Sequence, residues 1–274
     1  MSIQLIPYKP AATIGSGPYV LREYKPDTGV DISALSITYT GAHTDYGMVT
    51  MSDGARYRLL AFTSSGTLSI EQPVNCEVCV VGGGANGAKA EESGLSAGSG
   101  DGGAGAYLKN QSVSAYNGGS VVVGAGQGVS SIADVSVNAV SGQNGGTGAG
   151  GYTAGMGDGI SKYPFEDTGY SLWAGKPHCA GGGQGAESHM GKGYNGGNGG
   201  TNGGNGYRRG SNRVSNPSGG VGGSYGGGAG NGGNATYYGS GAGGGKYLYP
   251  TTFDNGGSGY QGIVYMRIPE DQAA

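Results

Sequence analysis

Hydrophobic and polar residues alternate along residues 31–81 as β-strands require. In the segment 32–40, ISALSITYT, one face of an extended chain holds Leu35, Ile37 and Tyr39. Three further segments show strand patterns, namely 55–63 (ARYRLLAFT), 67–72 (TLSIEQ) and 76–81 (CEVCVV). The SSG at 64–66 supplies a turn between two of them. We therefore expect a small antiparallel sheet in this part of the chain.

The residues before this sheet carry no regular pattern. Residues 1–30 are interrupted by Pro7, Pro10, Pro18 and Pro26, which indicates an extended arm. Such an arm either binds along a partner chain or is a disordered terminus. Neither a signal peptide nor an apolar run long enough to span a membrane is recognisable in the sequence.

After Val81 the alternation stops and glycine dominates. Of the 66 glycines in 274 residues, seven precede Gly82 and the other 59 lie between Gly82 and Gly262. They form runs of G-G-x and G-x units, such as GYNGGNGGTNGGNG at 193–206, separated by loops with aromatic and charged residues. The region has too few apolar side chains for a conventional core. Disorder is the alternative, but a net charge of only −3 and 20 tyrosines argue against it.

The spacing of the glycines favours one kind of order. A repeat near three residues matches an extended left-handed helix with three residues per turn. Collagen is excluded because it needs a strict G-X-Y repeat and abundant proline. Polyglycine II helices packed side by side can exchange backbone hydrogen bonds, and many such bonds together offset the entropy that glycine loses. We expect a sandwich of these helices and almost no α-helix.

The stretch CEVCVVGGGANG contains a G-x-G-x-x-G spacing at Gly82, Gly84 and Gly87. In a dinucleotide enzyme this motif closes a strand and opens a helix whose N-terminus binds the pyrophosphate. Here a strand precedes the motif, but the many glycines that follow disfavour a helix. We therefore expect these glycines to allow close approach of neighbouring backbones, and we expect no cofactor.

The few chemically reactive side chains form no recognisable catalytic or metal-binding set. Cys76 and Cys79 lie three positions apart on an expected strand, so their side chains face opposite sides of the sheet. Cys179 follows His178, which makes a zinc site the alternative, but each cysteine is better interpreted as a small buried hydrophobe. No pair of carboxylates suits polysaccharide hydrolysis. We expect a protein that is not an enzyme and holds no metal.

Several motifs together resemble a known family. RLLAFTSSGTLSI followed by CEVCVVGGGANG, then GGAGAYLKNQSV with GGSVVVGAGQ, and finally GYQGIVYMRI resemble the glycine-rich domain of phage tail and fibre proteins. The layout of glycine runs and loops is similar to that of the distal tail-fibre adhesins of T-even-like phages. The resemblance covers residues 58–268 and implies a polyglycine II domain there. It leaves residues 1–57 as an N-terminal arm with strands for attachment or assembly, and 269–274 as a C-terminal tail. For the segment from GGAGAYLKNQSV to GGSVVVGAGQ, residues 102–127, the resemblance implies a hairpin that ends in V-G-A-G.

The resemblance implies a virion protein that binds a host surface molecule through the loops between glycine helices. Tyrosine, tryptophan and arginine are the residues enriched at binding hot spots, and they gather in the loops 160–178, 207–217 and 246–254. The candidate receptor-binding residues are Tyr163, Tyr170, Trp173, Tyr207, Arg208, Arg209, Tyr247 and Tyr249. Aromatic residues that only cover lattice edges are the alternative for each of them.

The expected partners follow from this assignment. They are other virion proteins, contacted through the N-terminal region, and a host surface protein or polysaccharide, with homo-oligomerisation left open. The low net charge gives no reason to expect nucleic acid or membrane insertion. The expected location is the surface of the particle, after assembly in the host cytoplasm. A structural virion component without receptor binding, such as a head decoration, head fibre or tail-assembly protein, is the alternative function.

Overall fold

The computed structural model describes five stretches of the chain and the backbone of seven short strands that lie between them. The stretches are residues 30–89, 105–137, 163–180, 233–245 and 255–272. The short strands are β5 (Glu91–Ser93), β6 (Ser96–Gly98), β10 (Glu187–His189), β11 (Lys192–Tyr194), β12 (Arg213–Val214), β13 (Tyr247–Leu248) and β14 (Thr252–Phe253). These parts of the chain are mainly β-strand, with one 3-10 turn, η1 (Pro164–Glu166), and no α-helix. This confirms the expected β class; the N-terminal arm lies outside the described residues.

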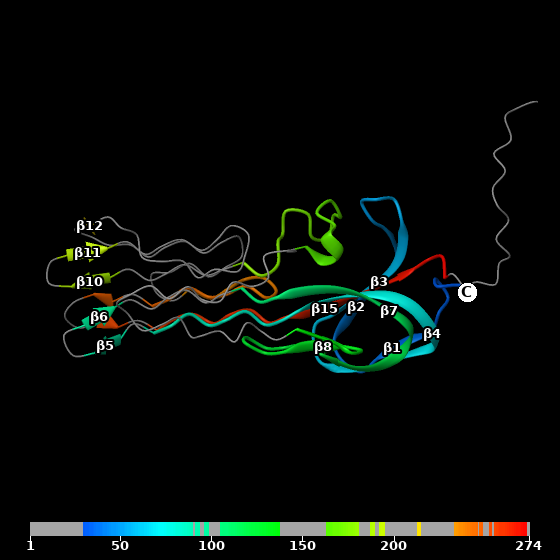
Figure 1. Ribbon diagram of the computed structural model, residues 1–274, viewed down its shortest axis with the longest axis horizontal. Coiled ribbons are helices and arrows are strands. Elements are labelled where there is room, and N and C mark those ends of the chain that lie inside the picture. The colour runs from blue at the N-terminus through cyan, green and yellow to red at the C-terminus, as the bar shows by residue number, and fades with distance from the viewer. Residues whose placement is uncertain are drawn as a thin grey trace, which may run out of the picture.

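The main sheet has eight strands in the order β2, β3, β15, β4, β7, β8, β9, with β1 paired to β4. Its strands are β1 (Ile37–Tyr39), β2 (His43–Thr50), β3 (Arg56–Phe62), β4 (Gly66–Val81), β7 (Leu108–Val122), β8 (Ser130–Ile132), β9 (Val135–Val137) and β15 (Ile263–Pro269). Every pair is antiparallel, as expected. The sheet joins strands from both ends of the described chain, and the expected division at residues 57 and 58 falls within β3 (Figure 1).

Two long strands differ from what the sequence predicts. Residues 67–72 and 76–81 belong to one strand, β4, because its pairing with β7 continues through register shifts on both sides of Val74. The segment 108–122, where the family resemblance implies a hairpin, is also a single strand, β7. Its partner in antiparallel pairing is β4, so the hairpin expectation within this segment is wrong.

The first described residues form a turn before the short strand β1. Of the expected strand 32–40, only Ile37–Tyr39 pairs with β4. The turn ahead of it is fixed by the Asp31 carboxylate, which accepts hydrogen bonds from the backbone N–H and the hydroxyl of Ser33 at 3.0 Å and 2.6 Å. This local side-chain bonding competes with strand pairing and delays the start of the strand.

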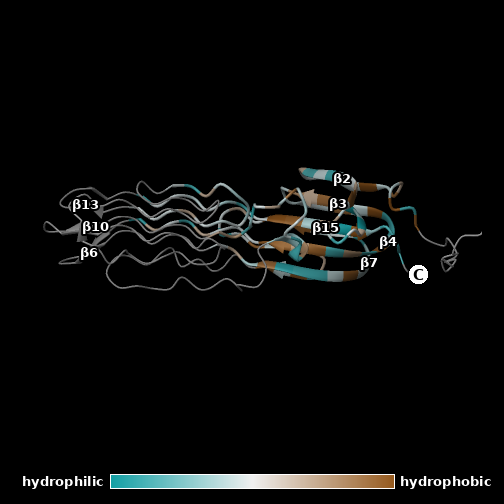
Figure 2. Ribbon diagram, turned by 90° about the horizontal axis from the view of Figure 1, so that it is seen from above, coloured by the Kyte–Doolittle hydropathy of each residue, from teal (hydrophilic) through white to brown (hydrophobic). Residues whose placement is uncertain are grey.

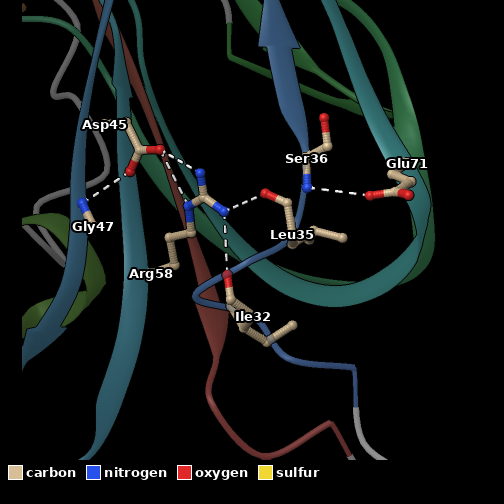
Figure 3. A network of polar contacts seen from close by, with 7 residues as sticks. All are labelled: Ile32, Leu35, Ser36, Asp45, Gly47, Arg58 and Glu71. Atoms are coloured by element: carbon tan, nitrogen blue, oxygen red, sulfur yellow. Dashed lines mark hydrogen bonds and ion pairs between the residues drawn. The ribbon is translucent and has the colours of Figure 1, made fainter.

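Arg58 on β3 holds that turn against the sheet. Its Nη1 donates to the carbonyl oxygen of Ile32 at 3.1 Å and also to that of Leu35, while its Nη2 forms an ion pair with Asp45 at 2.6 Å (Figure 3). The Arg58 side chain is only 13% exposed. A charged donor of this kind, with its partners in place, contributes more than an exposed surface ion pair.

Side chains pack on both faces of the main sheet. The first cluster includes Leu60, Phe62, Val78, Val80, Val264 and Met266; the second includes Leu59, Ala61, Cys79, Val81, Ile263 and Tyr265. The alternation of neighbours between the two clusters follows the period of two along a strand. Cys76 belongs to the first cluster and Cys79 to the second, which confirms that they face opposite sides. Figure 2 shows the hydrophobic colour concentrated in this sheet.

Three neighbouring strands of the main sheet meet glycine-rich sequence at the same level of the sheet. Val81, the last residue of β4, pairs with Ile263 at the start of β15 and with Leu108 at the start of β7. On the other side of this level the chain continues as glycine-rich segments that extend away from the sheet (Figure 1). The main sheet therefore serves as the base from which these segments run.

The glycine-rich segments 82–89, 233–245 and 255–262 bond to one another through their backbones. Each pairing repeats in steps of three residues. The donor–acceptor pairs are Gly84 N to Tyr260 O and Gly87 N to Gly257 O, Ala242 N to Ala85 O and Gly245 N to Ala88 O, and Tyr260 N to Ser240 O and Gly257 N to Gly243 O. Each segment thus bonds to both of the others, whereas in a flat sheet the two outer strands would not meet. The three segments therefore pack as a solid bundle.

Glycine is required here by close approach of neighbouring backbones. A Cβ atom added to Gly84 would lie closer than 3.0 Å to the Ser240 carbonyl, and one added to Gly87 would meet the Gly243 carbonyl in the same way. Neither residue has the positive φ that favours glycine. The expectation of close backbone approach at Gly84 and Gly87 is confirmed, and the described residues that follow them begin no helix.

Candidate functional site

The described candidate residues lie at two separate ends of the molecule. The loop 163–180, which carries Tyr163, Tyr170 and Trp173, covers the second face of the main sheet, and its residues belong to the second core cluster. The short strands β5, β6 and β10 to β14 lie at the opposite end, beyond the glycine segments (Figures 1 and 2). The structure does not bring the loops 160–178 and 246–254 together.

Asp167 fixes the loop 163–180 to the main sheet. Its carboxylate accepts hydrogen bonds from the backbone N–H of Ser52, Gly169 and Tyr170, each at 3.0 Å, and from the Ser52 hydroxyl. Burial would raise the pKa of Asp167, but the bonds donated by Ser52, Gly169 and Tyr170 outweigh it and hold the pKa below its ordinary value. The ionised carboxylate therefore organises the loop at neutral pH.

The start of the loop is held in a strained conformation. Phe165 and Glu166 have φ of +56° and +61°, which costs a residue with a side chain roughly 1–2 kcal/mol. The Phe165 backbone N–H donates to Asn110 Oδ1 at 3.0 Å, and the Arg267 guanidinium lies 4.4 Å from the Phe165 ring centroid. Arg267 is in turn paired with Glu77 at 2.8 Å. These contacts help to offset the strain.

Trp173 belongs to the core rather than to the surface. It is 0% exposed, its indole N–H donates to the Asp167 carbonyl, and its ring contacts those of Tyr170 and Tyr265 at 4.9 Å and 5.4 Å. A receptor cannot reach this side chain in the described conformation, so the expectation that Trp173 is a receptor anchor is wrong. An aromatic residue in a polar loop carries no local sign of its burial. Tyr163 and Tyr170 are half-buried beside it.

His178 and Cys179 are also core residues. The His178 ring is fully buried, and its Nε2 lies 3.1 Å from the Tyr265 hydroxyl. Burial lowers the pKa of His178 to about 3, so the ring is neutral. The rings of Tyr237 and Tyr238 lie 4.9 Å and 6.1 Å away. Among the described residues, no group of His, Cys, Asp and Glu side chains could hold a metal ion.

The far end of the molecule consists of two small sheets. One has five strands in the order β12, β11, β10, β13, β14, in which β10 and β13 are parallel and the other pairs are antiparallel. The other is the hairpin of β5 and β6. We call these strands the distal strands. The pairs β5–β6, β10–β11 and β13–β14 are joined by short connections, as in hairpins.

Some of the candidate residues belong to this end. Tyr247 is the first residue of β13, where it pairs in register with Phe253 of β14. Tyr249 belongs to the three-residue connection between those strands and lies outside the described residues, as do Tyr207, Arg208 and Arg209. Within the loop 207–217 the structure describes β12, which is one edge strand of the five-stranded sheet.

Two exposed tyrosines are absent from the residues that the sequence singles out. Tyr46 on β2 is 40% exposed and Tyr260, in the last glycine segment, is 36% exposed. Tyr260 lies beside the half-buried Tyr238, with 5.5 Å between their ring centroids. Neither belongs to an aromatic-rich loop, so no local pattern marks them.

No family model matches the chain, and comparison with curated proteins and with solved structures gives no match. In the part of the chain that is described, no helix is long and apolar enough to cross a membrane.

Proposed function

We propose that this chain is a bacteriophage virion protein, an adhesin that presents the distal strands to a host surface molecule. The observation that carries the proposal is the position of these strands at the end of the glycine segments farthest from the main sheet (Figure 1). Short hairpins on a rigid support lose little conformational entropy on binding. The edge strands β12 and β14 of the five-stranded sheet offer backbone groups for recognition.

The support itself, we propose, is a lattice of polyglycine II helices that continues along the glycine runs. Three described segments already bond to one another in steps of three residues, the repeat of that helix. Similar short glycine repeats recur at 181–185, 195–206 and 219–232, before and after the distal strands β10 to β12. Such a lattice needs no apolar core, which suits the composition of residues 82–262.

The main sheet is then the attachment end of the protein. It contains the first described residues, and the chain before Val30 leads into it. Partner virion proteins would bind here, through residues 1–57. The alternative, a structural virion component without receptor binding, uses the same base but gives the distal strands no host ligand.

The proposal is tested on the purified full chain and on the particle. Labelled protein is incubated with a panel of bacterial strains, and antibody against the chain is localised on virions by electron microscopy. Tyr249→Ala and Arg208→Ala, in the loops that accompany the distal strands, should each weaken cell binding about thirtyfold, the effect of losing 2 kcal/mol at a hot spot, with an unchanged Tm.

Tyr163→Ala is the matched control, because it removes an aromatic side chain at the opposite end of the molecule. It should leave cell binding unchanged. Label on the capsid, together with equal cell binding by all three variants, would replace the adhesin with the structural component.

A further inference from the structure

One glycine segment connects the two ends of the molecule directly. The segment 255–262, which we call the strut, follows β14 of the distal strands and continues into β15 of the main sheet at Ile263 (Figure 1). Four of its eight residues are glycine, so few side chains of its own are available to hold it. The place of β14 relative to the main sheet therefore depends on how firmly neighbouring segments hold the strut.

The backbone N–H groups of the strut point in different directions. Donors three positions apart serve the same neighbour, since Gly257 N and Tyr260 N both donate to carbonyl oxygens of the segment 233–245, at 2.8 Å and 2.9 Å. The two N–H groups between them, those of Ser258 and Gly259, point elsewhere, as they do in an extended chain with three residues per turn. These two donors need acceptors from other sides of the strut.

Two asparagine side chains supply these acceptors. Asn234 Oδ1 accepts the Ser258 N–H at 2.8 Å, and Asn86 Oδ1 accepts the Gly259 N–H at 2.9 Å. Because each donor is a backbone N–H, the atom that faces it must be the carbonyl oxygen of the side-chain amide and not its NH₂ group. The four successive N–H groups from Gly257 to Tyr260 are therefore all bonded, two of them to side chains.

Each asparagine belongs to a segment that also contacts the strut through its backbone. On either side of Asn86, the N–H groups of Gly84 and Gly87 donate to carbonyl groups of the strut at 2.8 Å and 3.0 Å. Next to Asn234, the Ala235 N–H donates to a third strut carbonyl at 3.0 Å. At both places the neighbouring backbone donates to the strut and the asparagine side chain accepts from it, so the bonding runs in both directions.

The two side-chain bonds differ in their access to water. Ser258 and Asn234 are exposed, whereas Gly259 and Asn86 are half-buried. A Cβ atom added to Gly259 would lie closer than 3.0 Å to the Gly84 carbonyl, so the backbones are in close contact there. If the side-chain acceptor is removed, water can replace it more readily at Ser258 than at Gly259, and the unpaired N–H costs more at Gly259.

We propose that Asn86 and Asn234 are positioning residues that hold the strut against its two neighbours and thereby fix β14 relative to the main sheet. This role concerns how the glycine bundle keeps its shape. It goes beyond the proposed binding of a host molecule and does not depend on it. The role requires a short side chain with an acceptor oxygen, which aspartate also provides and alanine does not.

The test uses the full chain and hydrogen exchange resolved for single amides by NMR. In Asn86→Ala the Gly259 amide should exchange about tenfold faster or more than in the parent protein, and in Asn234→Ala the Ser258 amide should show a smaller increase. Asn86→Asp and Asn234→Asp keep an acceptor oxygen at the same place, so they should restore most of the protection. Asn117→Ala, at an exposed position of β7, is the matched control and should leave both amides unchanged.

A second measurement follows the position of β14 itself. Spin labels attached at Thr44→Cys on β2 and Thr252→Cys on β14 report the distance between the main sheet and the distal strands, and the three native cysteines are buried. The distance distribution should be broader in the double variant Asn86→Ala, Asn234→Ala than in the parent protein. The proposal is overturned if the strut amides exchange at parental rates in the alanine variants, if the aspartate variants lose as much protection as the alanine variants, or if the distance distribution stays unchanged.

Discussion

The main sheet and the glycine segments that leave it are two solutions to packing within one chain. In the sheet, large side chains fill both faces, and Leu59 and Leu60 on successive positions are each 0% exposed. In the glycine segments, backbones fill the interior, and residues 239–245 are buried although most of them are glycine or alanine. The sheet excludes water with side chains, and the glycine segments do so with hydrogen-bonded peptide groups.

The difference decides how each region responds to substitution. A side-chain core loses stability when atoms are removed, because a cavity remains. A backbone-packed region loses stability when atoms are added, because neighbouring chains must separate and leave buried N–H and C=O groups unpaired. Side-chain packing ends and backbone packing begins between Val81 and Gly82, because three neighbouring strands meet glycine-rich sequence at that level.

The largest effect is expected from Gly84→Ala. The new methyl group would lie closer than 3.0 Å to the Ser240 carbonyl, a backbone group that cannot rotate away. The bundle of glycine segments must then open, and we expect a loss of more than about 4 kcal/mol, seen as a fall in Tm of roughly 10 °C or more.

Gly126→Ala is the matched control for this prediction. A Cβ atom at Gly126 would meet the Gly259 carbonyl at 3.1 Å, so a shift of a few tenths of an ångström accommodates it. Thermal unfolding of the two variants compares the same chemical change at two distances. Equal melting temperatures would show that backbone packing does not hold the glycine segments together.

The opposite substitution tests the main sheet. Leu60→Ala removes a side chain that is 0% exposed in the first core cluster, and such a change costs about 2–5 kcal/mol. Val122→Ala, on the exposed side of β7, should cost well under 1 kcal/mol. Chemical denaturation measures both. If Leu60→Ala were as mild as its control, the sheet would not depend on its side-chain core.

The sheet could be predicted because hydrophobic and polar residues alternate within each strand, where the sequence itself shows them. The strands 55–63 and 76–81 and the opposite faces of Cys76 and Cys79 could be read from a period of two. The close approach at Gly84 and Gly87 could also be predicted, because a strand that runs into glycines without a following helix favours backbone packing. The pairing of β15 with β3 and β4 joins residues about 200 positions apart, and only the resemblance of GYQGIVYMRI to a closing strand hinted at it.

The candidate site was harder to predict, because burial depends on contacts between distant segments. Trp173 has the residue type of a surface anchor, and it proved to be a core residue since Tyr265 of β15 and Asp167 enclose it. Tyr46 and Tyr260 carried no signal at all, because each stands alone among small or polar residues in the sequence. Composition shows which loops are rich in aromatic residues, but it does not show whether each aromatic side chain is buried or exposed in the folded protein.

The smallest expected effect concerns pH and separates the two regions in another way. The loop 163–180 depends on the ionised Asp167, whose pKa is lower in the folded protein than in the unfolded chain. Because the folded pKa is the lower one, the stabilisation is complete above the unfolded value near 4 and is lost as the pH falls through the folded value. The backbone bonds between the glycine segments involve no titrating group.

Acidification should therefore loosen the loop before it affects the glycine segments. Asp167→Asn should be less stable than the parent protein at pH 7, by about 1–3 kcal/mol for the lost charged acceptor, and this difference should shrink as the pH falls below about 4. Hydrogen exchange monitors both regions in one sample: the amides of Gly169 and Tyr170 should lose protection in the variant, while those of Gly84 and Gly87 should keep it.

Ser52→Ala removes one donor to the same carboxylate and should give a smaller change of the same sign. Protection lost equally in both regions would mean that the loop and the glycine segments unfold as one unit, and the distinction between side-chain and backbone packing would then have no consequence for how the protein opens.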